Sequence, residues 1–147
     1  MNPIYLRPSR GLTFMNMAHV ISQRATCPRL HVGAVIVKDG RVLSMGYNGA
    51  PPGEEHCDAV GCDLRGPTGG CVRAIHAEAN AIAWAARAGI AIDGATMYCT
   101  HSPCLACCRL IQAVGIEALA YTHWYRETEL PPRMHTFPII PTVAMAP

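Results

Sequence analysis

The sequence predicts an α/β layer fold in which helices cover a mixed central β-sheet. Two features indicate it: a β-hairpin pattern lies in the N-terminal half, and helical and strand patterns then alternate as far as residue 121. A hairpin followed by such alternation is typical of a mixed sheet, and right-handed crossovers would carry the two later helices over one of its faces. The 147 residues fit one compact domain, and half of them are apolar, as a filled core requires. We therefore expect a single domain over residues 1–147.

The N-terminal elements are a helix and the hairpin. A helix is predicted over residues 11–25, because apolar residues recur at i, i+4, i+7 and i+11 from Phe14. Residues 31–37 form a nearly continuous apolar, β-branched run, which indicates a strand buried on both faces. The Asp-Gly pair within residues 38–41 is a hairpin signal, and residues 42–47 form the returning strand.

The C-terminal elements follow a long Gly/Pro-rich loop over residues 46–71. Loops longer than about 12–15 residues without secondary structure are uncommon and usually functional. Helices are then predicted over residues 76–89 and 104–115, both ending at a glycine. Strands are predicted over residues 95–100 and 116–121.

Charge and cysteine content restrict the class of protein. The net charge is +2 and the basic residues are scattered, so the sequence lacks the basic block typical of nucleic-acid-binding arms. No apolar run approaches the roughly 20 residues that span a bilayer, and the N-terminus does not resemble a secretion signal. We therefore expect a cytoplasmic protein without a membrane partner. In that reducing compartment, eight cysteines indicate metal binding or catalysis rather than disulfides.

Two motifs together predict a catalytic zinc centre. Cys104 and Cys107 lie three residues apart at the start of a helix, where they share one face and where the helix dipole stabilises thiolates. His76 begins the other strong helix and supplies a third ligand, which leaves an open position for water. Glu78 can stand beside that position and transfer protons. The order H-x-E…P-C-x-x-C is the signature of zinc nucleobase deaminases.

Each motif has a plainer interpretation when it is taken alone. A His-x-Glu pair occurs by chance, and a Cys-x-x-Cys pair can be a redox pair; the combination is what makes the signal specific. Cys104 could also share a helix face with Cys108. The location of Cys107 in the first turn, together with the signature, favours Cys107 as the ligand. Cys108 is then a buried or spare thiol, and Cys99 lies in an apolar strand and belongs to the core.

The chain resembles the deoxycytidylate (dCMP) deaminase family within the cytidine deaminase superfamily. The resemblance rests on "HVGAVIVKDGRVLSMGYNGAPPG", "HAEANAIAWAARAG" and "GATMYCTHSPCLACC". The GYNG-x-P-x-G element, Gly46 to Gly53, separates this group from tRNA adenosine deaminases and free-nucleoside deaminases. The resemblance implies a three-layer α/β/α cytidine-deaminase-like fold with a mixed central sheet.

The resemblance also implies an activity, the hydrolytic deamination of dCMP to dUMP and ammonia, which feeds dTTP synthesis. His76, Cys104 and Cys107 would hold Zn²⁺, and Glu78 would shuttle protons from water to ring N3 and to the leaving amine. Asn48 would contact the nucleotide, or else only shape the turn before a glycine. The candidates for the phosphate contact are Arg29 and Arg126, each of which could equally be an ordinary surface arginine.

Family resemblance further implies assembly and regulation. Members are commonly homo-oligomers, often hexamers, and many are activated by dCTP, with Mg²⁺ as its companion ion, and inhibited by dTTP. Neither spacing nor composition tests these properties.

Four further cysteines suggest a second, structural zinc. The long loop has few apolar residues to offset its ordering entropy, and a closed four-ligand zinc site would do so. Some phage and bacterial members that the chain resembles use one cysteine before the first strand and one after GYNG, positions that match Cys27 and Cys57. Cys62 and Cys71 would complete the set, with His56 in reserve; four unbound thiols or a disulfide are the alternatives.

The tail from residue 122 departs from the family. Its prolines, from Pro131 onward, disfavour a long helix, so we expect it to cover a neighbouring subunit or to lack order. A 5-modified deoxycytidylate therefore stays open as substrate, as does cytosine or adenine in a polynucleotide. The last alternative is a zinc-stabilised interaction protein without activity, against which the intact Glu78 and ligand set argue.

Overall fold

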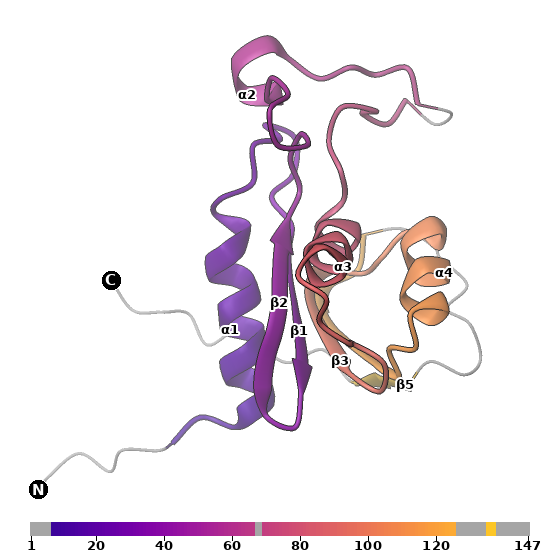
Figure 1. Ribbon diagram of the computed structural model, residues 1–147. Helices are drawn as coiled ribbons and strands as arrows, with labels where there is room; N and C mark the ends of the chain where they lie inside the picture. Colours follow the sequence, from indigo (N-terminus) through magenta and orange to yellow (C-terminus); the bar gives the residue numbers. More distant parts are fainter. Residues whose placement is uncertain (1–6, 67–68, 126–134, 138–147) are drawn as a thin grey trace, which may run out of the picture.

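The structure is a computed structural model that describes residues 7–66, 69–125 and 135–137, and in these residues helices lie on both sides of one sheet (Figure 1). The elements in chain order are α1 (Arg10–Ser22), β1 (Gly33–Lys38), β2 (Arg41–Tyr47), α2 (Cys57–Val60), α3 (Ala77–Arg87), β3 (Thr96–His101), α4 (Leu105–Ala113), β4 (Ala118–His123) and β5 (His135–Phe137). No helix within these residues is long and apolar enough to cross a membrane.

The sheet of the described residues is mixed, with the strand order β2-β1-β3-β4-β5. β1 pairs antiparallel with β2 and β3, whereas β3, β4 and β5 run parallel. The β1–β2 turn has positive φ at both central residues, 52° at Asp39 and 73° at Gly40. These values are those of a type I′ turn, which matches the twist of the two strands. The predicted hairpin is therefore confirmed.

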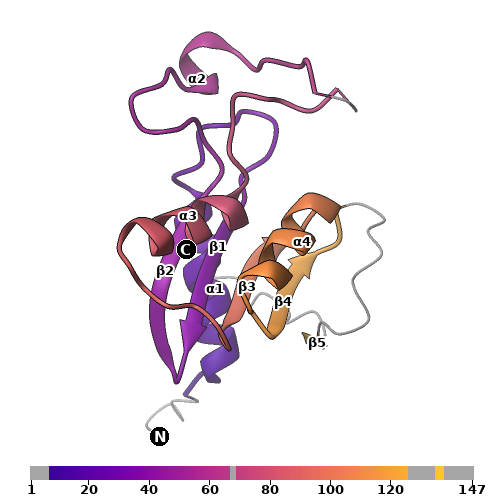
Figure 2. The same cartoon turned by 45° about the vertical axis from the view of Figure 1, so that its right-hand side comes forward.

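Alternating residues of β1 pack against different helices, which defines three layers. Ala34 and Ile36 belong to the core cluster that contains residues of α3 and α4, such as Ile111. Val35 and Val37 belong to the cluster built on α1. Successive side chains of a strand point to opposite faces, so α1 covers one face of the sheet and α3 and α4 cover the other, as Figure 2 shows. The predicted α/β/α fold is confirmed.

The position of α3 on the sheet depends on a close approach at Gly46. A Cβ atom at this residue would lie 2.5 Å from the carbonyl oxygen of Ala77, so a larger residue would push the helix away. Two side-chain bonds hold the helix in place: Ser44 Oγ donates to the carbonyl of Ala81 at 2.7 Å, and Asn80 Nδ2 donates to the carbonyl of Tyr47 at 2.8 Å. These contacts fix where α3 begins, next to β2.

Several predicted boundaries need correction. The first helix ends at Ser22 rather than at residue 25. The chain leaves the helix there because the N–H of Thr26 donates to the carbonyl of Asn48 at 3.1 Å instead of to a helical carbonyl. The first strand begins at Gly33 rather than at residue 31, because the N–H of Val32 is bonded to the Asn48 side chain. The four-residue helix α2 within the long loop was not predicted.

The tail also differs in part from the expectation. Residues 122 and 123 extend β4, and residues 135–137 form β5 alongside it, so these residues are ordered additions to the sheet. The expectation of disorder was wrong for them. Residues 126–134 and 138–147 lie outside the described part of the chain.

Candidate active site

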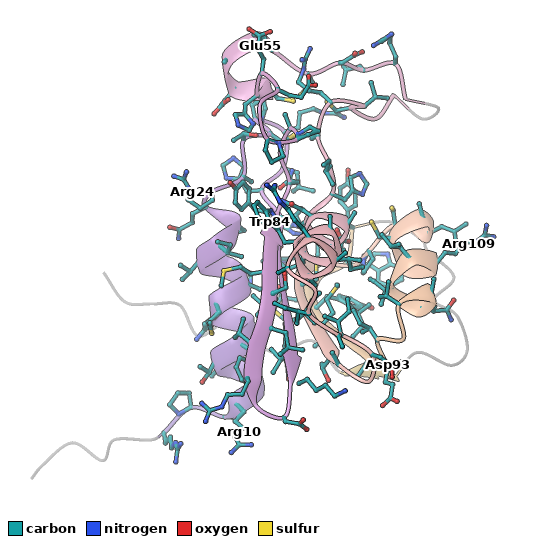
Figure 3. All side chains as sticks on the ribbon, viewed as in Figure 1. Arg10, Arg24, Glu55, Trp84, Asp93 and Arg109 are labelled. Atoms are coloured by element: carbon teal, nitrogen blue, oxygen red, sulfur yellow. The ribbon has the colours of Figure 1, made fainter. Side chains whose placement is uncertain are left out.

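The N-termini of α3 and α4 bring together three side chains that could hold a metal ion. His76 is the N-cap residue of α3 and Cys104 is that of α4, and neither side chain caps its own helix. Cys107 lies within the first turn of α4. The Nδ1 atom of His76 lies 3.5 Å from the Sγ atoms of both cysteines, and the three ligand atoms all lie within 4.8 Å of one another. Figure 3 shows both helices, with Trp84 labelled on α3 and Arg109 on α4.

The electrostatics of this cluster favour a bound cation. Hydrogen bonds from Cys107 and His76 lower the pKa of Cys104 to about 3, so this sulfur is a thiolate at neutral pH. The same thiolate, together with burial, raises the pKa of Cys107 while no cation is present. Two sulfurs and an imidazole nitrogen that converge on one point are the donors that zinc prefers.

Cys108 and Cys99 lie apart from the cluster. The Sγ of Cys108 is fully buried and donates to the carbonyl of Pro103 at 3.7 Å. Cys99 is fully buried in the core cluster between β3 and α3. Of the two cysteines that could partner Cys104, the structure therefore brings Cys107 to His76 and turns Cys108 toward the backbone.

Glu78 is a buried carboxyl beside the cluster. It lies in the first turn of α3 and is only 4% exposed, yet it lines the same cavity as His76 and Cys104. Burial raises the pKa of its carboxyl. A raised pKa brings the protonated form closer to neutral pH, so the group can both take up and release a proton.

The cavity in front of the cluster is large enough for a nucleotide. Its volume is about 650 Å³, within the range of small-molecule sites. The polar and aromatic residues that line it include Arg29, Asn48, Glu78, His101, Ser102 and Tyr125.

Asn48 and Arg29 both reach the cavity, and both make bonds within the chain. Asn48 is 8% exposed; its Oδ1 accepts from the N–H of Val32 and its Nδ2 donates to the carbonyl of Leu30, each at 2.8 Å. Arg29 is exposed, and its Nη1 donates to the carbonyl of Gly69 at 3.3 Å. Arg126 lies outside the described residues.

Three of the four remaining cysteines form a second cluster. The sulfurs of Cys57, Cys62 and Cys71 lie within 4.8 Å of one another, with 3.6 Å between Cys57 and Cys71. Cys27 is buried near this group but is not part of it. The ring of His56 bonds to Thr26 instead, with Nδ1 at 3.1 Å from the hydroxyl oxygen.

The second cluster also contains an acidified thiol. Although burial opposes it, hydrogen bonds from the backbone of Ala74 and Arg73 lower the pKa of Cys71 to about 7. Burial and the neighbouring thiols raise the pKa of Cys57 to about 12.

Sequence reasoning did not single out His101, Ser102 or Tyr125, all of which line the cavity. The signal available was position: His101 and Ser102 directly precede the Pro-Cys pair, and Tyr125 follows the last predicted strand. Their convergence depends on the parallel register of β3 and β4, in which His101 pairs with His123.

Comparison with known proteins agrees with this geometry. Residues 8–123 match the family model described as cytidine and deoxycytidylate deaminase zinc-binding region. The chain belongs to this family. The resemblance found in the sequence motifs is thus confirmed.

The chain is similar to several curated proteins. It is 44% identical to ComE operon protein 2 of Bacillus subtilis (strain 168) over 113 residues, which are 77% of this chain and 59% of that protein. It is 43% identical to the deoxycytidylate deaminase of Mycobacterium phage D29 over 125 residues, 78% of this chain and 95% of that protein. The chain thus spans nearly all of the phage protein but less than two thirds of the Bacillus protein.

A solved structure has the same fold. The crystal structure of dCMP deaminase from the cyanophage S-TIM5 in complex with dCMP and dUMP matches with a TM-score of 0.75 and 32% identity. The match covers 90% of this chain and 100% of that one.

Proposed function

We propose that the protein is a zinc-dependent deaminase that converts dCMP and water to dUMP and ammonia, as one domain over the whole chain. The observation that carries the proposal is the meeting of His76, Cys104 and Cys107 beside the buried Glu78 in a nucleotide-sized cavity. Relatives at 43% and 35% identity are named deoxycytidylate deaminases, which supports this substrate.

The three ligand atoms fit a catalytic zinc, because one nitrogen and two sulfur donors leave a fourth position open. Zinc, when bound, lowers the pKa of the water that attacks C4 of the base. Glu78 accepts a proton from this water and delivers it to ring N3. It then accepts the hydroxyl proton and delivers it to the amine, so that ammonia leaves and C4 keeps a carbonyl oxygen.

Substrate binding is proposed to use Arg29 and Asn48. Among the described residues that line the cavity, Arg29 is the one with a permanent positive charge, which suits a phosphate. Asn48 keeps one N–H and one lone pair beyond its two bonds within the chain, so it can contact the nucleotide as well. Arg126 stays a second phosphate candidate from sequence alone.

A second zinc is proposed at Cys57, Cys62 and Cys71, with Cys27 as the fourth ligand after a small shift. The three sulfurs already converge, which suits a structural zinc. Val60 and Leu64 in this loop, and Val72 directly after it, are exposed, so apolar burial does little to hold the loop. A bound ion would supply that stabilisation.

We extend the proposal to the properties that members of this family share. They are homo-oligomeric assembly, often as a hexamer in this family, activation by dCTP with Mg²⁺, inhibition by dTTP, a role in dTTP supply and a cytoplasmic location.

The experiment is deamination of dCMP by purified protein, followed by ultraviolet absorbance with and without dCTP and Mg²⁺. Deoxycytidine, a 5-substituted dCMP and a short cytosine-containing oligonucleotide serve as parallel substrates. We expect turnover of dCMP and little of deoxycytidine. Turnover of the oligonucleotide or of the 5-substituted nucleotide without turnover of dCMP would overturn the proposed substrate while keeping the chemistry.

A further inference from the structure

The parallel ladder between β3 and β4 ends in an unusual way. His101 pairs with His123, and the N–H of Ser102 donates to the carbonyl of His123 at 2.8 Å. One more step of a parallel ladder would bring the N–H of Tyr125 to the carbonyl of Ser102. That N–H donates instead to Oγ of Ser102, at 2.8 Å. The serine hydroxyl therefore takes the place of its own carbonyl, and the ladder stops.

The chain changes direction where the ladder stops. In a regular strand, residues three apart lie on opposite faces of the sheet. The rings of Tyr121 and Trp124 nevertheless meet, with their centroids 6.0 Å apart. Trp124 is 52% exposed, whereas the next residue, Tyr125, lines the cavity of the candidate active site. The alternation of β4 thus ends after His123, and Tyr125 becomes part of the cavity wall.

Ser102 is held firmly enough to act as an anchor for Tyr125. Its side chain is only 3% exposed, so water competes poorly for the bond. The next residue, Pro103, is fully buried, and a proline restricts the residue before it to extended backbone. On the cavity side, the ring of Tyr125 meets the ring of His101 edge to face, with centroids 6.3 Å apart.

We infer that Ser102 is a positioning residue whose hydroxyl holds Tyr125 in the wall of the substrate cavity. This inference rests on the proposed function for the identity of the substrate. Ser102 acts through Tyr125 and takes no part in the chemistry itself. The affinity for the substrate should therefore depend on this hydroxyl, whereas the zinc ligands and Glu78, which belong to the starts of α3 and α4, keep their places.

The test is a double-mutant cycle with Ser102→Ala and Tyr125→Ala, in which KM and kcat for dCMP are measured. Ser102→Ala removes the acceptor of the Tyr125 N–H. We expect KM to rise about five- to tenfold, with kcat and zinc content within about twofold of the wild type. Tyr125→Ala keeps the backbone N–H but removes the ring, and should raise KM at least as much. In this background Ser102→Ala should change KM by less than about twofold, because the ring that it positions is absent.

Thr122→Val is the matched control. Thr122 has a second buried hydroxyl at the end of β4, which donates to the carbonyl of Thr100 at 2.8 Å, and it does not line the cavity. Valine has nearly the same shape and removes this bond, so the melting temperature should fall about as much as in Ser102→Ala. KM should stay within about twofold of the wild type. The contrast separates the positioning of Tyr125 from a general loss of stability.

A measurement on the wild-type protein needs no variant to fold. Because the Tyr125 N–H is bonded to a buried hydroxyl, its amide hydrogen should exchange with solvent more slowly than in an unstructured peptide. Exchange at the rate of an unstructured peptide would overturn the inference.

The kinetic results can overturn it as well. Ser102→Ala with the wild-type KM would do so, as would a rise in KM that is equal with and without the Tyr125 ring, or equal in Thr122→Val. Each of these results leaves the proposed function intact, because the wild-type protein still deaminates dCMP. A zinc-loaded wild-type protein that does not deaminate dCMP would instead overturn the proposed function, and this inference with it.

Discussion

Removal of the Asn48 side chain should destabilise the protein through two backbone groups. In Asn48→Ala, the N–H of Val32 and the carbonyl of Leu30 both lose partners at 2.8 Å. The side chain is 8% exposed, so water replaces these bonds poorly. An unsatisfied buried group costs about 1–3 kcal/mol, which gives roughly 2–4 kcal/mol for the pair after partial relaxation. For a chain of this size the melting temperature should fall by roughly 6–12 °C.

Asn48→Asp separates the two bonds. The remaining oxygen still accepts from Val32, but a carboxylate oxygen now faces the carbonyl of Leu30, which repels it. Burial and this carbonyl raise the pKa of the new carboxyl in the folded state, so the variant gains stability relative to the wild type as pH falls and the carboxyl becomes a donor. The assay is urea unfolding of both variants at pH 7 and at pH 5, with Ser44→Ala as a variant that removes one bond. A midpoint of Asn48→Ala within experimental error of the wild type would refute the reasoning.

Three further predictions concern the histidines and cysteines. The pKa of His101 is lowered from 6.5 to about 4 in the folded state, so the unfolded chain takes up this proton at a higher pH than the folded chain does. The free energy of unfolding should therefore fall as pH drops from about 6.5 to 4. In calorimetry, His101→Leu should flatten this dependence on pH. Cys62→Ala should lower the zinc content by one ion per chain and lower the melting temperature; unchanged values of both would exclude the second zinc. Cys107→Ser should lose both the catalytic zinc, measured by metal analysis, and dCMP turnover, whereas Cys108→Ser should keep both. The reverse pattern would exchange the roles of these cysteines.

The placement of His76, Glu78, Cys104 and Cys107 beside one another could be predicted because it is local. Cys104 and Cys107 share a face through one helical turn, and His76 and Glu78 belong to one helix start, so sequence spacing alone determines most of their geometry. The hairpin was predictable for the same reason, since an Asp-Gly pair adopts the positive φ angles that its turn needs.

Features that depend on long-range packing could not be predicted in this way. The cavity contacts of His101 and Tyr125 arise from the register between β3 and β4, which no local pattern determines. The early end of α1 and the late start of β1 both follow from the bonds that Asn48 and its neighbours make across the loop. Sequence reasoning treated Asn48 as a nucleotide contact or a turn residue and missed its role in joining residues 30 and 32 to the loop.

The most direct test of the account is Glu78→Gln, measured for zinc content and dCMP turnover beside the wild type. Gln keeps the size of the side chain, but it cannot carry a proton between water and base. We expect the same zinc content and a loss of kcat of about 10²-fold or more. Turnover within a few fold of the wild type at equal zinc content would contradict the central claim that Glu78 is the proton carrier of a zinc-dependent deaminase.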